Sequence, residues 1–184
     1  MAKHEPISYT KTCMPMSDHL TEQKRSWNMS RIRSSHTKPE IILRSLLHRA
    51  GFRFRIHCKD LPGCPDVVLA KYRTAIFVHG CFWHRHTGCP RASVPNRNVE
   101  YWTQKFRANK ERDSSAMRNL RRRGWNAMVV WECELLSEPI ATVNRIFSEL
   151  EPERANSYRV SMSRKDVLKY ASDRFEEYLR KSEP

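Results

Sequence analysis

The sequence predicts a mixed α/β fold, in which a small β-sheet is flanked by helices. Three features support this class: an apolar stripe at helical spacing near residue 45, two short β-branched runs between residues 67 and 78, and a buried run near residue 130. Long helical segments lie on either side of the last run. The resulting order of helix, hairpin, helix, strand and helix is typical of a sheet covered by helices.

The first helix begins at a capping box. Residues 37–40 read Thr-Lys-Pro-Glu, with the proline in the first turn, and Gly51 is expected to end the helix. Its apolar stripe consists of Ile42, Leu43, Leu46, Leu47 and Ala50. The capping role is sufficient to explain Glu40, and a second role in holding a metal-bound water is left open.

The two β-branched runs predict a hairpin. Residues 67–69 and 74–78 are short, apolar and separated by Lys71-Tyr72-Arg73. If the turn centres on Tyr72, Asp66 lies opposite Val78 at the open end of the hairpin.

The remaining elements follow from periodicity and from glycine stop signals. Residues 98–123 predict a long helix ended by Gly124, and residues 127–131 predict a third buried strand leading into Cys133. Two further amphipathic helices are expected, one carrying Ile140, Val143, Phe147 and Leu150, the other Val167, Ala171, Phe175 and Tyr178. We therefore expect a flexible basic arm at 1–20, a main domain at 21–150, and a charged linker with a C-terminal helix at 151–184.

The charge balance favours a polyanionic partner. The 184 residues include 34 Lys and Arg against 20 Asp and Glu, a net charge of +14. Simple solubility or binding to anionic lipid would also explain this charge, but the basic residues are spread among Trp, Tyr and Phe, which favours nucleic acid. Because no apolar run is long enough to span a membrane and no secretory signal is recognisable, we expect a cytoplasmic protein.

The segment 79–89 contains three histidines and two cysteines, too many polar atoms for a core strand. Cys81, His86 and Cys89 have the spacing C-x4-H-x2-C, and Cys133 can supply a fourth ligand from across the sheet. Four protein ligands with no open position are typical of structural zinc. The alternatives are buried thiols with surface histidines, or a site in which His84 replaces His86.

Two acidic residues are candidates for catalysis. Asp66 begins a strand, where a carboxylate and the backbone carbonyl of Val78 could hold Mg²⁺, although Pro-Asp is also a common turn dipeptide. Asp113 and Asn109 lie on the apolar stripe of the long helix, so they need hydrogen bonds or a metal shell.

Three aromatic residues are candidates for contact with DNA bases. Phe82 and Trp83 lie between the metal-ligand candidates, where exposed aromatic side chains are costly without a function. Trp102 fits the helical stripe and is explained by the core alone. Aromatic side chains on a basic surface can insert between base pairs and unstack them.

Several segments together resemble the very-short-patch repair endonucleases, a family of bacterial DNA mismatch enzymes. The similarity runs in family order over about residues 20–136. The matching segments are residues 25–29 (RSWNM), 61–66 (LPGCPD), 77–84 (FVHGCFWH), 100–102 (EYW), 109–113 (NKERD), 124–125 (GW) and 131–133 (WEC). The resemblance implies a restriction-endonuclease-like fold and cleavage 5′ to the thymine of a T:G mismatch, the product of 5-methylcytosine deamination.

The resemblance also implies a role for each candidate residue. Asp66 and the Val78 carbonyl would bind Mg²⁺, and His84 would act as the base or position the attacking water. The groups implied to support the metal-bound waters are His79, Asp113 and Glu40. The implied structural zinc ligands are Cys81, His86, Cys89 and Cys133, and the residues implied to insert beside the mismatch are Phe82, Trp83 and Trp102.

Two other functions are compatible with the sequence. One is a zinc-stabilised DNA-binding module without catalysis, which the acidic residues argue against, since carboxylates repel phosphate unless a cation intervenes. The other is a restriction-type enzyme that cuts both strands, which would require a symmetric dimer. No dimer seam is recognisable, so we expect a monomer that acts on double-stranded DNA, with mismatch-repair proteins as candidate partners.

Overall fold

The computed structural model describes residues 21–31, 33–152 and 163–182. It divides into two units, residues 1–32 and 33–184, which are described separately. In the first, helix α1 (Glu22–Ser30) was not predicted, and the guanidinium of Arg31 lies 4.2 Å from the centre of the Trp27 ring. The predicted arm at 1–20 and most of the predicted linker lie outside the described residues.

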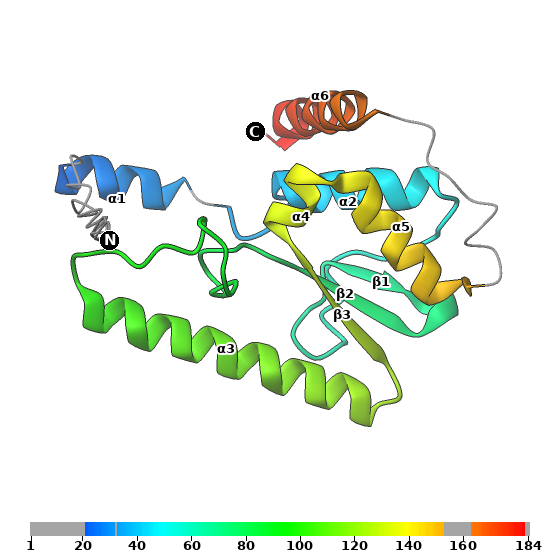
Figure 1. Cartoon of the computed structure of the whole chain (residues 1–184), viewed down its shortest axis with the longest axis horizontal. Coiled ribbons are helices and arrows are strands. Elements are labelled where there is room, and N and C mark those ends of the chain that lie inside the picture. Colours follow the sequence, from blue (N-terminus) through cyan, green and yellow to red (C-terminus); the bar gives the residue numbers. More distant parts are fainter. Residues whose placement is uncertain (1–20, 32, 153–162, 183–184) are drawn as a thin grey trace, which may run out of the picture. The chain divides into compact units, whose positions relative to one another are not determined.

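The second unit contains the predicted elements in the predicted order (Figure 1). The elements are α2 (Lys38–Arg49), β1 (Val67–Leu69), the 3-10 turn η1 (Ala70–Tyr72), β2 (Thr74–His79), α3 (Val99–Arg122), β3 (Asn126–Trp131), α4 (Glu132–Ser137), α5 (Pro139–Leu150) and α6 (Arg164–Ser182). Among the described α-helices of this unit, the short helix α4, which carries Cys133, had no counterpart in the sequence-based prediction.

The sheet is mixed, as predicted. Its order is β1-β2-β3, with β1 antiparallel to β2 and β2 parallel to β3. The predicted hairpin register was wrong by one residue, because Val67 pairs with Ile76 and the register therefore places Asp66 opposite Phe77. The cause is η1, which closes at Arg73 in a left-handed conformation (φ 45°) and moves the centre of the turn toward Lys71.

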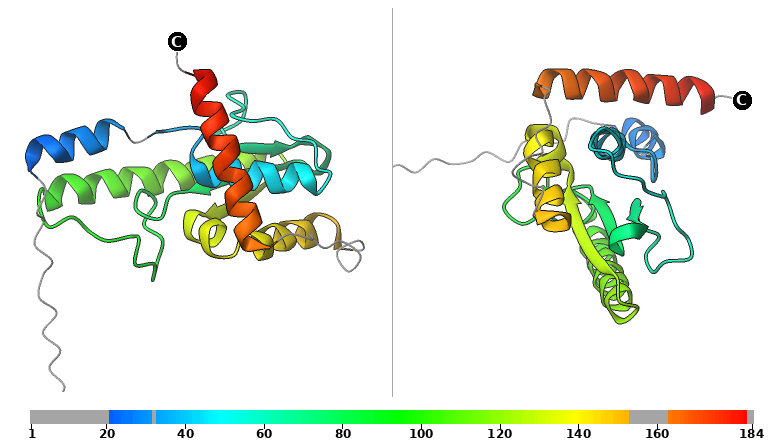
Figure 2. Two further views of the ribbon diagram at one scale, coloured as in Figure 1. Left: turned by 90° about the horizontal axis from the view of Figure 1, so that it is seen from above. Right: turned by 90° about the vertical axis from the view of Figure 1, so that its right-hand side faces the viewer.

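The sheet separates two apolar cores. Alternate strand residues point to opposite faces, so Val67 and Ile76 pack toward α2 and α5, while Val68 and Phe77 pack toward α3. Figure 1 shows α3 on one side of the sheet and α2, α4 and α5 on the other. Figure 2 shows α6 lying across α2, with which it is in contact. No helix in the described part of the chain is both long and apolar enough to cross a bilayer.

The helix boundaries follow the predicted signals. The capping box of α2 is present, with both Thr37 and Glu40 in their capping roles. Gly51 (φ 83°) and Gly124 (φ 70°) adopt left-handed conformations just after α2 and α3. Gly63 allows a close approach, since a Cβ there would lie 2.6 Å from the Ala116 Cβ of α3. The loop that leads into Asp66 is thereby held against α3.

Candidate active site and metal centre

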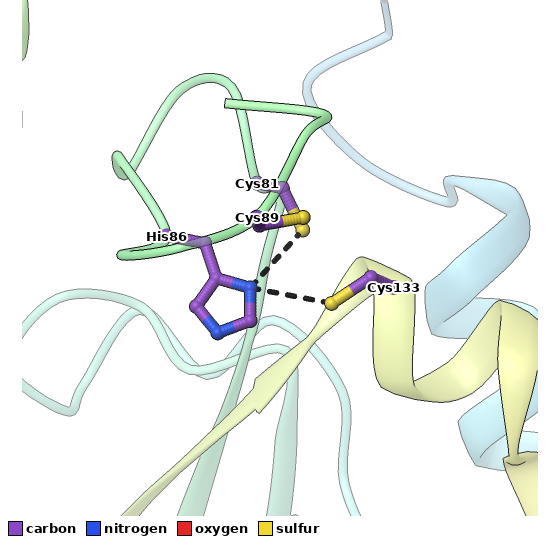
Figure 3. A group of neighbouring side chains, drawn as sticks. All are labelled: Cys81, His86, Cys89 and Cys133. Carbon is purple, nitrogen blue, oxygen red and sulfur yellow. Dashed lines mark hydrogen bonds between the residues drawn. The ribbon is translucent and has the colours of Figure 1, made fainter. Parts of the chain in front are cut away.

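The loop after β2 and the start of α4 bring together four potential metal ligands (Figure 3). They are Cys81, His86, Cys89 and Cys133, whose ligand atoms all lie within 4.8 Å of one another. The His86 Nδ1 atom lies 3.6 Å from the Cys81 sulfur and 3.2 Å from the Cys133 sulfur. His84 does not belong to this group, so the alternative in which His84 replaces His86 is not favoured.

Local geometry explains how a short loop presents these atoms together. The backbone turns through left-handed residues at Arg85 and Gly88, and the His86 ring stacks on Trp131 at 4.1 Å. Burial raises the pKa of the Cys81 thiol to about 12 and also raises the pKa of the Cys133 thiol, so these two sulfurs are poorly suited to ionise without a cation. A soft cation bound at the four atoms would stabilise the thiolates, which fits a metal site.

A second group lies at the end of β2 and on the facing side of α3. It consists of His79, His84 and Asp113, and the His79 and His84 rings stack at 3.8 Å. The His84 Nδ1 atom lies 2.6 Å from the Asp113 carboxylate. The expectation that the polar residues of the α3 stripe need partners is confirmed, because the side-chain amide of Asn109 also donates to the Trp83 carbonyl at 2.9 Å.

The electrostatic surroundings indicate which side chains of this group carry protons. Burial, aided by His84, lowers the pKa of His79 to about 4, so His79 is neutral at neutral pH. Burial alone would raise the pKa of Asp113, but the hydrogen bond from His84 and the charges of His84, His79 and Arg112 together outweigh it, so the pKa is lowered. An ionised Asp113 accepts the Nδ1 proton of His84 and leaves Nε2 of that ring available to accept a proton.

Asp66 lies at the open end of the hairpin, and a hydrogen bond fixes one of its carboxylate oxygens. The backbone N–H of Val78 donates to Oδ2 at 2.7 Å. Burial raises the Asp66 pKa to about 6, the Val78 hydrogen bond opposes this, and the nearby His84 also lowers it. Because the N–H and C=O of one strand residue leave on the same side, the Val78 carbonyl faces the same strand edge. Carboxylate and carbonyl oxygens are ligands that Mg²⁺ accepts.

Part of the surroundings of Asp66 was not predicted from the sequence. Glu40, His57 and Asp66 form a third compact group of potential ligands, and Arg44 of α2 donates to both Glu40 and His57. Arg44 lies one helical turn after Glu40, a spacing visible in the sequence. No sequence signal placed His57, because it approaches through an irregular loop.

The aromatic candidates form one cluster between the metal loop and α3. Phe82 lies 5.1 Å from Trp83 and 5.2 Å from Trp102, with edge-to-face geometry. Phe106, which was not predicted as a site residue, lies beneath Phe82 at 5.3 Å and is buried. All three candidates are half-buried, so each keeps part of its ring at the surface.

A basic groove of about 590 Å³ runs along α3 next to this cluster. Its charged lining is Arg85, Arg107, Lys110, Glu111 and Arg118. Arg85 is anchored through the Ala92 and Ser93 carbonyls and lies 4.9 Å above the Phe106 ring. Three other basic side chains are exposed along one helical stripe, with a geometry suited to a row of phosphates.

Carboxylates and imidazoles gathered at one sheet edge, beside a basic groove, are typical of a nuclease. Comparison with known proteins agrees. The family described as DNA mismatch endonuclease Vsr matches residues 17–91. The chain is also 45% identical over 137 residues to the type II nicking enzyme V.XorIIP of Xanthomonas oryzae pv. oryzae, covering 74% of this chain and 99% of the relative.

Two further relatives show the same extent of similarity. The type II nicking enzyme V.NmeAIP of Neisseria meningitidis serogroup A is 41% identical over 138 residues, covering 74% of this chain and 98% of the relative. The DNA mismatch endonuclease Vsr of Escherichia coli is 40% identical over 136 residues, covering 74% and 86%. The chain belongs to the Vsr family of DNA endonucleases.

Proposed function

We propose that this chain is a strand-specific DNA mismatch endonuclease that nicks duplex DNA 5′ to the thymine of a T:G mismatch. The proposal rests on one observation above all: a partly buried carboxylate, Asp66, interacts electrostatically with His84 of the hydrogen-bonded pair His84–Asp113 in a member of the Vsr family. A restriction-endonuclease-like arrangement of the mixed sheet and action in the cytoplasm are part of the same proposal.

Mg²⁺ fits the oxygen atoms around Asp66. Oδ2 is held by the Val78 N–H, and the partly buried carboxyl, with its raised pKa, gains most from a neighbouring cation. The residues that would hold the ion are Asp66 and Val78, the latter through its carbonyl. When bound, Mg²⁺ would neutralise the scissile phosphate and stabilise the leaving 3′ oxygen.

His84 is proposed to take the proton of the attacking water. Asp113 holds its Nδ1 at 2.6 Å, so Nε2 is the acceptor nitrogen, and His79 stacks on the ring at 3.8 Å and limits its rotation. An imidazole oriented by a carboxylate is a competent general base near neutral pH. Asp113 and His79 therefore act through His84 as positioning residues.

Zinc is proposed to occupy the group formed by Cys81, His86, Cys89 and Cys133. Because all four positions would be filled by protein atoms, this ion would be structural. It would connect the loop that carries His84 to helix α4, and so fix the base relative to the sheet.

The cluster of Phe82, Trp83 and Trp102 is proposed to insert beside the mismatch. The three rings pack against one another next to the basic groove, where they could act as a wedge. Since a mismatched pair costs less to open than a matched one, a wedge favours the mismatch before any base edge is read.

The two alternative functions are less well supported. A non-catalytic module would not need the His84–Asp113 pair beside Asp66. A restriction-type enzyme would need a symmetric dimer, whereas we propose a monomer that nicks one strand and passes the product to repair proteins.

The test is cleavage of a T:G duplex and of its T:A control, each with Mg²⁺ and with a chelator. We expect a single nick 5′ to the mismatched thymine, only with Mg²⁺. Asp66→Ala is expected to abolish nicking while leaving mismatch binding intact, with Asp60→Ala, an exposed neighbouring acid, as the control. Equal cutting of both duplexes, cutting of both strands, or full activity of Asp66→Ala would refute the proposal.

A further inference from the structure

Arg44 occupies the centre of a buried polar network next to Asp66. Its Nη2 atom lies 2.5 Å from Glu40 Oε2 and 2.9 Å from His57 Nε2, and its Nη1 lies 3.2 Å from His36 Nδ1. The side chains of Arg44 and Glu40 are only 11% and 4% exposed. A network this deeply buried holds its members in one geometry.

The carboxylate of Glu40 is fully used within this network. Oε1 accepts from the Thr37 N–H at 3.2 Å and the Thr37 hydroxyl at 2.8 Å. Oε2 accepts from the His36 N–H at 3.0 Å and from Arg44 at 2.5 Å. Because a carboxylate offers about four lone-pair sites, Glu40 has no further site to offer toward Asp66. Glu40 therefore acts on Asp66 directly only through its negative charge, and its hydrogen bonds act on Asp66 through Arg44.

The group that faces Asp66 from this network is His57. A guanidinium only donates hydrogen bonds, so the Nε2 atom of His57 must accept from Arg44, and the neutral ring carries its proton on Nδ1. That Nδ1 atom lies 3.9 Å from Asp66 Oδ1, the oxygen not held by Val78. This separation is too long for a direct hydrogen bond and suits one bridging water. His57 reaches this position from a left-handed backbone conformation (φ 47°).

We propose that His57 is a positioning residue for Asp66, holding Oδ1 through one water while the Val78 N–H holds Oδ2. Arg44 fixes the donor tautomer of His57, and Glu40 fixes Arg44. With its Nδ1 protonated and its Nε2 bonded to Arg44, His57 is not a metal ligand. The inference rests on the proposed role of Asp66 as the cation-binding carboxylate.

Two substitutions separate this role from a merely structural one. His57→Phe keeps an aromatic ring and removes both nitrogens. His57→Asn also removes the contact with Arg44 but keeps an N–H donor near the position of Nδ1, and Asn tolerates the left-handed backbone. The two variants therefore differ mainly in the donor that faces Asp66. His48→Asn, at an exposed position of α2, is the matched control.

The primary measurement is calorimetric binding of Mn²⁺ to the full-length, zinc-loaded protein without DNA, with thermal unfolding recorded for each variant. We expect His57→Phe to weaken Mn²⁺ binding about tenfold, as loss of an outer-shell hydrogen bond does, and His57→Asn by less than about threefold. The Mg²⁺ concentration for half-maximal nicking should shift in parallel, while T:G duplex affinity in chelator stays unchanged.

Equal losses in the Phe and Asn variants, or unchanged Mn²⁺ affinity in the Phe variant, would overturn the role of His57. The failure of the proposed function would look different. If Asp66→Asn bound Mn²⁺ as the parent does, the Asp66 site itself would be wrong. If Asp66→Asn lost Mn²⁺ binding while the His57 variants bound Mn²⁺ as the parent does, only the positioning role of His57 would be wrong.

Discussion

At the residue scale, ionisable groups of the site lie in surroundings that disfavour their charged forms, which lowers the folding stability of the protein. Asp66 is buried enough that its pKa rises to about 6, although Val78 and His84 both favour the charged form. His79 is held neutral by the same environment. Shifts of pKa in opposite directions at one sheet edge, upward for Asp66 and downward for His79, are typical of sites that bind a cation and move a proton.

The raised pKa of Asp66 predicts a cost in stability for the metal-free protein. Well below pH 3.8 the carboxyl is protonated in both the folded and the unfolded state. As pH rises toward 6, the unfolded chain ionises first, so stability falls between about pH 4 and 6 and stays lower above. Asp66→Asn should therefore stabilise the metal-free protein at pH 7 by about 1–3 kcal/mol. Urea unfolding measures this, and an unchanged or lower stability of the variant would contradict it.

His84 carries the catalytic prediction at this scale. His84→Ala should lower the single-turnover nicking rate about 10²–10⁴-fold, the usual contribution of a general base, with duplex affinity unchanged. His48→Ala, a change of the same kind at an exposed position, should have no effect. A His84 variant that nicks at the parent rate would remove this residue from the reaction.

At the element scale, the metal loop depends on α4, which contributes Cys133. Cys133→Ser should lower zinc content and melting temperature together, because the metal connects two segments far apart in the sequence. Cys64→Ser, a change at an exposed thiol outside the cluster, is the control. Metal analysis and thermal unfolding test this, and full zinc retention with normal melting would rule out the four-ligand site.

Helix α3 contributes to both chemistry and binding, because Asp113 lies on one face and the basic groove on the adjacent one. If Arg107 and Lys110 contact phosphates, replacing both by Ala should reduce the slope of log affinity against log salt by up to about 2, without changing mismatch preference. As the control, replacing Lys165 and Lys169 of α6 by Ala removes the same charge at positions outside the groove. Equal slopes for the two double variants would argue against the groove.

The predictability of each element depended on how local its signal was. The capping box at Thr37, the hairpin and the glycine stops were predicted because each is encoded within a few residues. The hairpin register was wrong by one residue because the 3-10 turn depends on the conformation of Arg73. Helix α4 is too short for periodicity to reveal.

At the scale of the whole unit from residue 33 onward, the site is assembled from distant segments. The ligand spacing predicted the Cys and His group, and the α3 stripe predicted that Asp113 faces inward. Arg44 and His57 could not be predicted, since their meeting with Asp66 depends on how α2 and an irregular loop dock on the sheet. Likewise, only the three-dimensional structure shows that hydrogen bonds from neighbouring groups occupy both carboxylate oxygens of Glu40.

The central claim is that one hydrated cation at Asp66 lies within reach of His84. The most direct measurement is anomalous diffraction from crystals of the protein with a T:G duplex and Mn²⁺. We expect a peak about 2.0–2.3 Å from the Asp66 carboxylate and the Val78 carbonyl, as small divalent cations require, with His84 Nε2 facing the scissile phosphate. A complex without a cation at Asp66, or with His84 turned away from the phosphate, would contradict the account.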